Sequence, residues 1–415
     1  MSSYSHRGYE HRTGGYGRRR RKSSGFRKKN PGKTVAKVTA ATAAAAAVIV
    51  LVYLFADNIS PFVNSFRKEE AVQTVDTPET AQIKNTDDEA VQTLAKGSFD
   101  EVDSDVFISN GSGFLKFKGI DTTAKNYAAV LNSISSSVSD SVNVYAAVIP
   151  TNTEIGLEGV LQGSNPQKMN LEVINSSLSD RVRYIDVYSV LSAHKNEYVY
   201  FRTDPCITSL GGYYTYREIA ETAGFDNKNI YSLDTLSEKS GVIPRFEGEY
   251  LARTSDAKKQ PHGNQELFNN ADTIEYYKLP VHYNCYSIDP VTGGRVETDL
   301  FSETDIPADD PLSVFPAKDT KLLYIENIQN SSTKKLLIIK DHVAEPVIGY
   351  LVPQYTQVHI ADASLYSGDL LSYINENEIT DVLFINGIDD ANNSLYCQRL
   401  RDLFDNSISD QRIQK

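Results

Sequence analysis

The chain has 415 residues, of which 40% are hydrophobic, so it is long enough for one large folded domain or two smaller ones. Its formal net charge of −12 is unevenly distributed, because residues 1–37 carry 12 Lys or Arg against one acidic residue, Glu10. About −23 is left for the remainder, which would repel nucleic acid and anionic lipid. We therefore expect no nucleic-acid partner for the body of the chain.

Residues 1–37 are rich in Arg, Gly, Ser and Tyr and are predicted to form a disordered basic tail. Residues 38–56 (VTAATAAAAAVIVLVYLFA) are uncharged and as a helix would extend roughly 28 Å, enough to cross a bilayer core. Basic residues precede this segment and Asp57 follows it. The positive-inside rule therefore predicts a single-pass protein of the cell membrane, with a cytoplasmic N-terminus and an extracytoplasmic main domain.

Two alternatives remain for this N-terminal part. The apolar segment could belong to a cleaved signal peptide that ends near residues 54–56. The basic tail could act as a nucleic-acid-binding arm through its run at residues 18–22. In either case the following residues, 57–97, are polar and acidic without a sustained period, and we predict a flexible extracytoplasmic stalk.

The folded domain is expected over residues 98–408. It opens with a hairpin at 107–117. Short apolar runs typical of buried strands occur at 142–150, 182–187, 198–202, 335–341, 356–361 and 380–385. Amphipathic patterns predict helices at 120–138, 169–178, 188–195, 209–223, 344–352, 366–377 and 394–404. This alternation predicts the α/β class, as a three-layer α/β/α sandwich with a mainly parallel sheet.

The alternation stops between residues 226 and 330. This stretch is rich in Pro, Gly and Asn, so we predict an irregular insertion that covers one edge of the sheet. An alternating segment before the turn at 289–294 indicates one hairpin inside it. The three cysteines, Cys206, Cys285 and Cys397, are widely spaced and fit no zinc-ligand pattern. We expect three separate thiols, with a single disulfide as the alternative.

Polar residues follow three of the predicted strands. They are Thr203, Asp204 and Cys206 after the strand at 198–202, Asp341 and His342 after the strand at 335–341, and Asn386 after the strand at 380–385. The carboxyl ends of parallel strands meet at one crevice, where open α/β sheets bind their ligands. An Asp at the end of a strand is also common as a simple helix cap. Both interpretations are open at this point.

Residues 198–225 resemble the defining segment of the DHHW proteins, which are membrane-anchored extracytoplasmic relatives of the SGNH hydrolases, found mainly in Gram-positive bacteria. The family segment reads approximately YYRTDHHWTTLGAYYAY, and this chain has YFRTDPCITSLGGYYTY. A second family signature, K-D-S-Y at the end of a strand, stands here as Lys340-Asp341-His342-Val343. Shorter agreements are VIPTNTEI (148–155), FEGE (246–249), RTS (253–255) and ITDVLFING (379–387). The resemblance runs in consistent order through the folded region and implies an SGNH-like fold.

The resemblance also implies a catalytic site that this chain has altered. In related acyl-transfer and esterase domains, a Ser nucleophile follows the later strand and an Asp-x-His pair follows the earlier one. The imidazole takes the proton of the serine, and the Asp orients the imidazole. Here the Asp is Asp204, the His position holds Cys206 and the Ser position holds His342. Losing members of such a unit lowers turnover by a factor on the order of 10⁶.

We therefore expect a catalytically degenerate protein whose crevice binds a cell-envelope glycan or an envelope-assembly protein. The alternative is an active esterase or O-acyltransferase for cell-surface polysaccharide, in which Cys206 is the nucleophile and His342 is the base. A third interpretation makes the basic tail the working part and the outer domain a sensor. A metal bound by Asp204, Cys206 and His342 would lack a fourth ligand, so we predict no metal and no cofactor.

Overall fold

A computed structural model describes residues 106–405, except positions 239, 256–260, 279, 305 and 308. It also describes Ala95 and the short strands β1 (Gln82–Lys84), β2 (Val91–Thr93) and β3 (Asp100–Glu101). The chain divides into two compact units, Met1–Pro78 and Glu79–Lys415, and every described residue belongs to the second. The predicted tail at 1–37 and the predicted transmembrane helix at 38–56 lie outside the described residues. Among the described helices, none combines the length and apolar character needed to cross a membrane.

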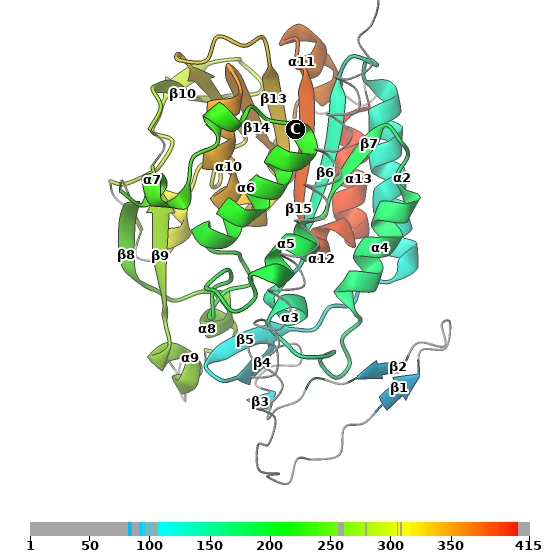
Figure 1. Cartoon of the computed structure of the whole chain (residues 1–415), viewed down its shortest axis with the longest axis vertical. Coiled ribbons are helices and arrows are strands. Elements are labelled where there is room, and N and C mark those ends of the chain that lie inside the picture. The colour runs from blue at the N-terminus through cyan, green and yellow to red at the C-terminus, as the bar shows by residue number, and fades with distance from the viewer. Residues whose placement is uncertain are drawn as a thin grey trace, which may run out of the picture. The chain divides into compact units, whose positions relative to one another are not determined.

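The domain is built on an eight-stranded sheet with the strand order β11-β10-β12-β14-β13-β15-β6-β7 (Figure 1). The last five strands in this order run parallel to one another. They are β14 (Gln357–Asp362), β13 (Lys335–Lys340), β15 (Asp381–Gly387), β6 (Asn143–Ile149) and β7 (Val182–Ile185). The prediction of a mainly parallel sheet in an α/β fold is thereby confirmed.

Successive residues of the parallel strands pack into two separate hydrophobic cores. In β13, Leu336 and Ile338 belong to one core, and Leu337 and Ile339 belong to the other. The first core is covered by α5 (Val187–Ala193), α6 (Ser209–Ala223) and α10 (Glu345–Leu351). The second is covered by α2 (Asp121–Ser137), α4 (Gln167–Ser177), α11 (Leu370–Glu376) and α13 (Ser394–Leu403). Burial on both faces explains the nearly continuous apolar runs of these strands.

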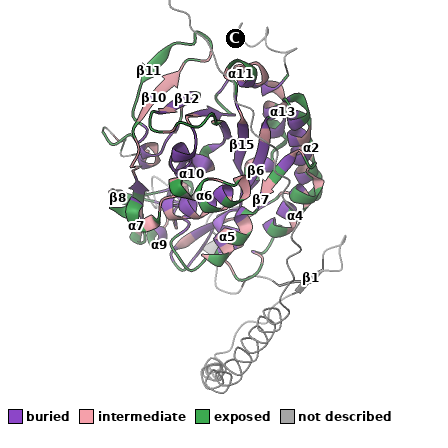
Figure 2. Ribbon diagram, turned by 45° about the horizontal axis from the view of Figure 1, so that its top comes forward, coloured by how far each residue is buried: buried purple, intermediate pink, exposed green. Residues whose placement is uncertain are grey.

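The burial pattern follows these three layers. In Figure 2 the central strands β15 and β6 are purple, whereas helices such as α4 and α6 carry green on their outer faces. Helix α6 begins at its N-cap Thr208, whose Oγ1 accepts a hydrogen bond from the Gly211 N–H, and ends at Gly224 in the left-handed region. Gly211 also has no room for a side chain, since a Cβ there would lie 2.3 Å from the Val199 carbonyl oxygen. Thr at an N-cap and Gly in a left-handed C-terminal cap are the residue types usually found at these positions.

The region between residues 226 and 330 contains more regular structure than its composition indicates. Strands β10 (Tyr283–Ile288), β11 (Arg295–Glu297) and β12 (Leu322–Asn327) extend the central sheet in antiparallel fashion. A separate ribbon pairs β8 (Ser240–Phe246) with β9 (Asp272–Tyr277), and the short helices are α7 (Leu233–Ser237), α8 (Glu249–Arg253) and α9 (Gln265–Asn269). The description of this region as irregular was wrong. Strands β10 and β11 form the hairpin expected around the turn at 289–294, whereas β12, which begins with four consecutive buried residues, was not expected.

The segment at 198–202 is not a strand of the sheet, contrary to the prediction. It forms only an isolated bridge between Tyr200 and Ile207, beside a hydrogen bond from the Phe201 N–H to the Cys206 carbonyl. The segment is a tight loop whose apolar side chains pack into the first core. Burial alone produced the apolar pattern that resembled a strand. The hairpin of β4 (Val106–Ser109) and β5 (Ser112–Leu115) is confirmed.

Candidate functional site

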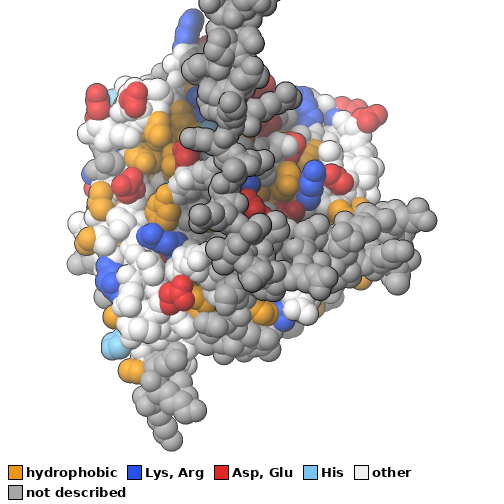
Figure 3. Space-filling view, turned by 60° about the horizontal axis from the view of Figure 1, so that its bottom comes forward, with side chains coloured by type: hydrophobic (Ala, Val, Ile, Leu, Met, Phe, Trp, Pro, Cys, Tyr) orange, Lys and Arg blue, Asp and Glu red, His pale blue; other side chains and the backbone are white. Residues whose placement is uncertain are grey.

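The carboxyl ends of β6, β13 and β15 open onto a pocket of about 370 Å³. Strand β15 lies between the other two, and the chain continues from β6 to its neighbour β7 on one side and from β13 to β14 on the opposite side. A reversal of this kind leaves a crevice at the ends of the strands. Figure 3 turns this end of the sheet toward the viewer and shows acidic, basic and hydrophobic side chains close together. The charged lining residues are Lys116, Lys118, Glu249, Arg253, Asp341, Asp389 and Asp390.

Two predicted site residues stand at the end of β13. Asp341 is buried, and its carboxylate accepts hydrogen bonds from the Val343 N–H at 3.0 Å and the Gly387 N–H at 2.6 Å. The first bond caps the short helix His342–Ala344, and the second ties the end of β13 to the end of β15. His342 is exposed and lines the pocket. The strand end therefore holds a fixed carboxylate and presents a solvent-accessible imidazole.

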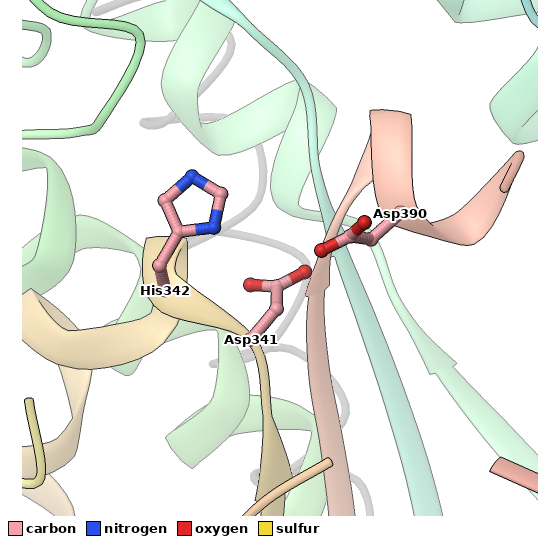
Figure 4. A group of neighbouring side chains, drawn as sticks. All are labelled: Asp341, His342 and Asp390. Atoms are coloured by element: carbon pink, nitrogen blue, oxygen red, sulfur yellow. The ribbon is translucent and has the colours of Figure 1, made fainter. Parts of the chain in front are cut away.

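Asp390 joins this pair from the short helix α12 (Ile388–Ala391). One oxygen of Asp341, one oxygen of Asp390 and one ring nitrogen of His342 all lie within 4.8 Å of one another (Figure 4). Burial, followed by the charge of Asp341, raises the pKa of Asp390 to about 7. Burial also raises the pKa of Asp341 to about 6. The two carboxyl groups are therefore poised to share a proton near neutral pH.

Asp390 was missed in the sequence, as was the adjacent Asp389, whose pKa burial raises to about 6. Both residues follow β15 within one turn of helix, so they sit at the same kind of strand end as the predicted residues. The acidic pair directly after the ING segment was the available signal. It could not show that α12 would turn back toward His342.

Asp204 and Cys206 lie together, and neither is among the residues that line the pocket. The Asp204 carboxylate accepts hydrogen bonds from the Cys206 N–H and the Glu249 N–H, both at 3.0 Å. Cys206 is only 4% exposed and is not among the residues that line the pocket with His342. Burial, reinforced by the neighbouring Asp204 carboxylate, raises the pKa of the Cys206 thiol well above its usual value. The thiol is therefore neutral at physiological pH, which makes it a poor nucleophile.

Thr203 anchors the same loop to the β8–β9 ribbon. Its N–H and its Oγ1 both donate to the carboxylate of Asp272, at 2.7 and 2.6 Å. Asp272 is fully buried and also accepts the Arg202 N–H at 2.9 Å. These bonds hold the backbone of the loop in place. The role of Thr203 in this structure is to position the loop.

Asn386 is likewise engaged behind the pocket. Its side-chain oxygen accepts a hydrogen bond from the Tyr127 hydroxyl at 2.6 Å, and its side-chain nitrogen donates to the Tyr396 hydroxyl at 2.6 Å. The residue has no exposed surface. It therefore links β15 to the helices of the second core and does not reach the pocket.

Lys340 forms a buried ionic cluster just behind the strand end. Its Nζ lies 3.0 Å from Glu345 and 2.9 Å from Asp362, and its side chain has no exposed surface. Burial opposes the positive charge, but the two carboxylates outweigh it and raise the pKa of Lys340. The cluster joins β13, α10 and β14, so it fixes the backbone that carries Asp341 and His342.

The described pocket lining provides little for nucleophilic catalysis. It contains no Ser or Cys, and its one hydroxyl residue is Thr151. The Thr151 Oγ1 accepts a hydrogen bond from Gln167 Nε2 at 2.7 Å, and the residue is buried. All three cysteines of the chain are free and buried, which confirms that they are separate thiols. The described residues of the pocket therefore offer charges, an imidazole and apolar walls, but no activated oxygen or sulfur nucleophile.

The chain matches a family model described as DHHW protein over residues 70–361. A DHHW family protein from Eubacterium siraeum has a similar crystal structure, with 26% identity, a TM-score of 0.62 and coverage of 72% of this chain and 95% of that chain. The structure of Bacillus cereus PatB1 shares the fold at 18% identity, with a TM-score of 0.53 and coverage of 70% of this chain and 98% of that chain. None of the curated proteins matches. Because the family match spans more than half of the sequence, this chain belongs to the DHHW protein family.

Proposed function

We propose that this chain is a catalytically degenerate DHHW protein whose pocket binds a cell-envelope glycan without transferring or removing an acyl group. One observation carries the proposal. The two positions that correspond to the nucleophile and the base of related enzymes hold His342 and Cys206, and only His342 lines the pocket. A histidine base with no nucleophile beside it has no hydroxyl or thiol to activate.

The size of the pocket favours a glycan over an envelope-assembly protein as the ligand. Small-molecule sites have volumes of roughly 300–1,000 Å³, whereas a protein partner needs a broad contact surface. The pocket measures about 370 Å³, which suits one or two sugar units. Its charged groups can bond sugar hydroxyls, and Arg253 at its wall is oriented by a 2.5 Å ion pair with Glu249.

The alternative, acyl transfer through Cys206 and His342, needs an accessible thiolate. Cys206 is buried and neutral, and the carboxylate beside it opposes loss of its proton. A base must also come within hydrogen-bond reach of its nucleophile. Among the described contacts of the two residues there is none between them. These features favour binding over catalysis.

The placement of the domain outside the cell is part of the proposal and rests on residues 1–56 of the sequence. Protease treatment of intact cells provides a test. The domain should be degraded while a tag at the N-terminus stays protected. Protection of the domain in intact cells would contradict the proposed orientation.

The catalytic part of the proposal is tested with the purified full-length chain and an activated acetyl ester. We expect no turnover above that of the His342→Ala variant. Turnover that is abolished by Cys206→Ala would overturn the proposal and establish the thiol enzyme instead.

The binding part is tested with isolated envelope polysaccharide. Arg253→Ala should weaken binding, because it removes a cationic donor from the pocket wall. Arg217→Ala is the matched control, since Arg217 is exposed and lies outside this pocket. Equal binding by both variants and the unaltered chain would contradict a glycan site in the pocket.

A further inference from the structure

We propose that Asp341, His342 and Asp390 form a binding site for a divalent transition-metal ion of the zinc or manganese class. The three side chains come from two segments that are nearly fifty residues apart, at the ends of β13 and β15. Each offers one ligand atom, and these atoms lie within 4.8 Å of one another at the pocket (Figure 4). The inference does not rest on glycan binding, because it concerns these side chains and the metal alone.

The separation of the donor atoms is close to what one ion requires. Zinc binds imidazole nitrogen and carboxylate oxygen at about 2.0–2.2 Å, so two ligands of a tetrahedral ion lie roughly 3.3 Å apart. Starting from a span of at most 4.8 Å, the donor atoms need to approach one another by up to about 1.5 Å. His342 is exposed and Asp390 is partly exposed, so both can turn toward the ion. Asp341 can stay where it is.

Two backbone hydrogen bonds fix the orientation of the Asp341 carboxylate, as is usual for metal ligands. The N–H groups of Gly387 and Val343 bond to its two carboxylate oxygens, one to each. Each carboxylate oxygen can accept more than one bond, so both keep a lone pair for an ion. Hydrogen bonds of this kind orient the ligands of known metal sites, and they raise the fraction of time that the donor atom points at the ion.

The pocket also contains three basic residues, Lys116, Lys118 and Arg253. Among the described residues, no Lys or Arg forms an ion pair with Asp341, Asp389 or Asp390. Arg253 is ion-paired with Glu249 instead. A divalent ion would supply the missing positive charge.

The imidazole decides the class of metal. Calcium and magnesium prefer sites made only of oxygen, whereas one nitrogen with two carboxylates suits zinc, manganese and related ions. Three protein ligands leave at least one coordination position open toward the pocket. Water or a hydroxyl group of a bound ligand can occupy that position.

The competing explanation for the same geometry is a proton shared by Asp341 and Asp390, with His342 as a bystander. The two explanations differ in the role of His342. A shared proton needs only the carboxyl groups, whereas the metal site needs the imidazole as well. Removal of the imidazole therefore separates them.

The test is calorimetric titration of the full-length chain with Zn²⁺ and, separately, with Mn²⁺ and Mg²⁺. We expect Zn²⁺ and Mn²⁺ to bind and Mg²⁺ to bind more weakly. His342→Ala and Asp390→Asn should each remove one equivalent of bound Zn²⁺ or weaken it by roughly tenfold or more. His282→Ala is the matched control, since His282 is exposed and lies outside the pocket, and it should bind like the unaltered chain. The tail residues His6 and His11 are present in every variant, so they cancel in the comparison.

A second readout uses Co²⁺, whose visible absorption reports coordination by protein ligands. The absorption should appear on titration of the unaltered chain and be lost in His342→Ala. Circular dichroism then checks that this exposed substitution leaves the fold intact. If His342→Ala binds Zn²⁺ with the same stoichiometry and affinity as the unaltered chain, or if the unaltered chain binds none, the carboxyl pair only shares a proton and the metal site is refuted.

Discussion

The two segments that carry the family signatures differ in the exposure of their polar side chains. At the end of β13, the carboxylate of Asp341 is fixed and the next side chain, His342, is exposed in the pocket. In the loop before α6, Asp204 and Cys206 are both buried, and the carboxylate bonds to backbone N–H groups. In the loop, the Asp204 carboxylate holds the backbone in place. At the strand end, the side chain after Asp341 is exposed and can contact a ligand.

This comparison predicts that substitutions in the buried ionic cluster of Lys340, at the end of β13, lower the free energy of unfolding most. Lys340→Ala removes the cation that is ion-paired with both Glu345 and Asp362, whose carboxylates are buried. Leaving such a pair uncompensated costs roughly 3–5 kcal/mol. Chemical denaturation should show a loss of this size in the free energy of unfolding. Lys334→Ala, on an exposed lysine nearby in sequence, is the control and should change little.

The loop should show the next largest effect. Asp204→Ala leaves the N–H groups of Cys206 and Glu249 without their carboxylate acceptor. Each buried unsatisfied group costs about 1–3 kcal/mol, so we expect a loss of roughly 2–4 kcal/mol in the free energy of unfolding. Asp204→Asn keeps one oxygen acceptor and should lose less. An Ala variant as stable as the unaltered chain would show that the loop does not depend on Asp204.

The buried His359, unlike the exposed His342, is expected to make the stability depend on pH. Burial, followed by the charges of Lys335 and Arg295, lowers the pKa of His359 from 6.5 to about 3. Between these pH values the unfolded chain binds a proton that the folded chain does not, so stability is full above pH 6.5 and is lost as the pH falls. The expected contribution is up to about 1.4 kcal/mol per pH unit.

Denaturation of the His359→Gln variant across that range tests this contribution. Gln can still accept a hydrogen bond from the Tyr373 hydroxyl, the partner of His359 Nδ1. The pH dependence of the free energy of unfolding should flatten by about one proton. An unchanged slope would mean that other groups cause the acid sensitivity.

The smallest effect is expected at the pocket itself. His342 is exposed and no hydrogen bond of its side chain is present among the described contacts, so His342→Ala should change the free energy of unfolding by less than about 0.5 kcal/mol. Thermal or chemical denaturation measures this directly. A loss comparable to that of Asp204→Ala would break the contrast between the two segments.

The features that the sequence predicts well are those that depend on local pattern. The strand β6, the helix α6, and the hairpin of β10 and β11 all follow from residues close in the chain. The loop at 198–202 was misjudged because a buried loop and a buried strand share the same apolar run. Strand β12 was missed inside a region that looked irregular.

The site was harder to predict because it depends on the order of the strands. Asp341 and His342 were selected from the end of β13, but their partner Asp390 comes from α12, and only the adjacency of β13 and β15 brings them together. The burial of Cys206 depends on packing against the first core, which its neighbours in sequence do not reveal. The sequence therefore identified the polar residues, but it could not show which of them line the pocket.

The central sheet ends at both sides in strands that discourage further growth. Strand β11 is only three residues long, and its Arg295 and Glu297 are exposed. Strand β7 at the opposite side has four residues and exposes Arg183. Short edges with charged side chains do not readily accept a strand from another molecule. The described edges of the sheet are therefore poor templates for edge-to-edge joining between two copies of the domain.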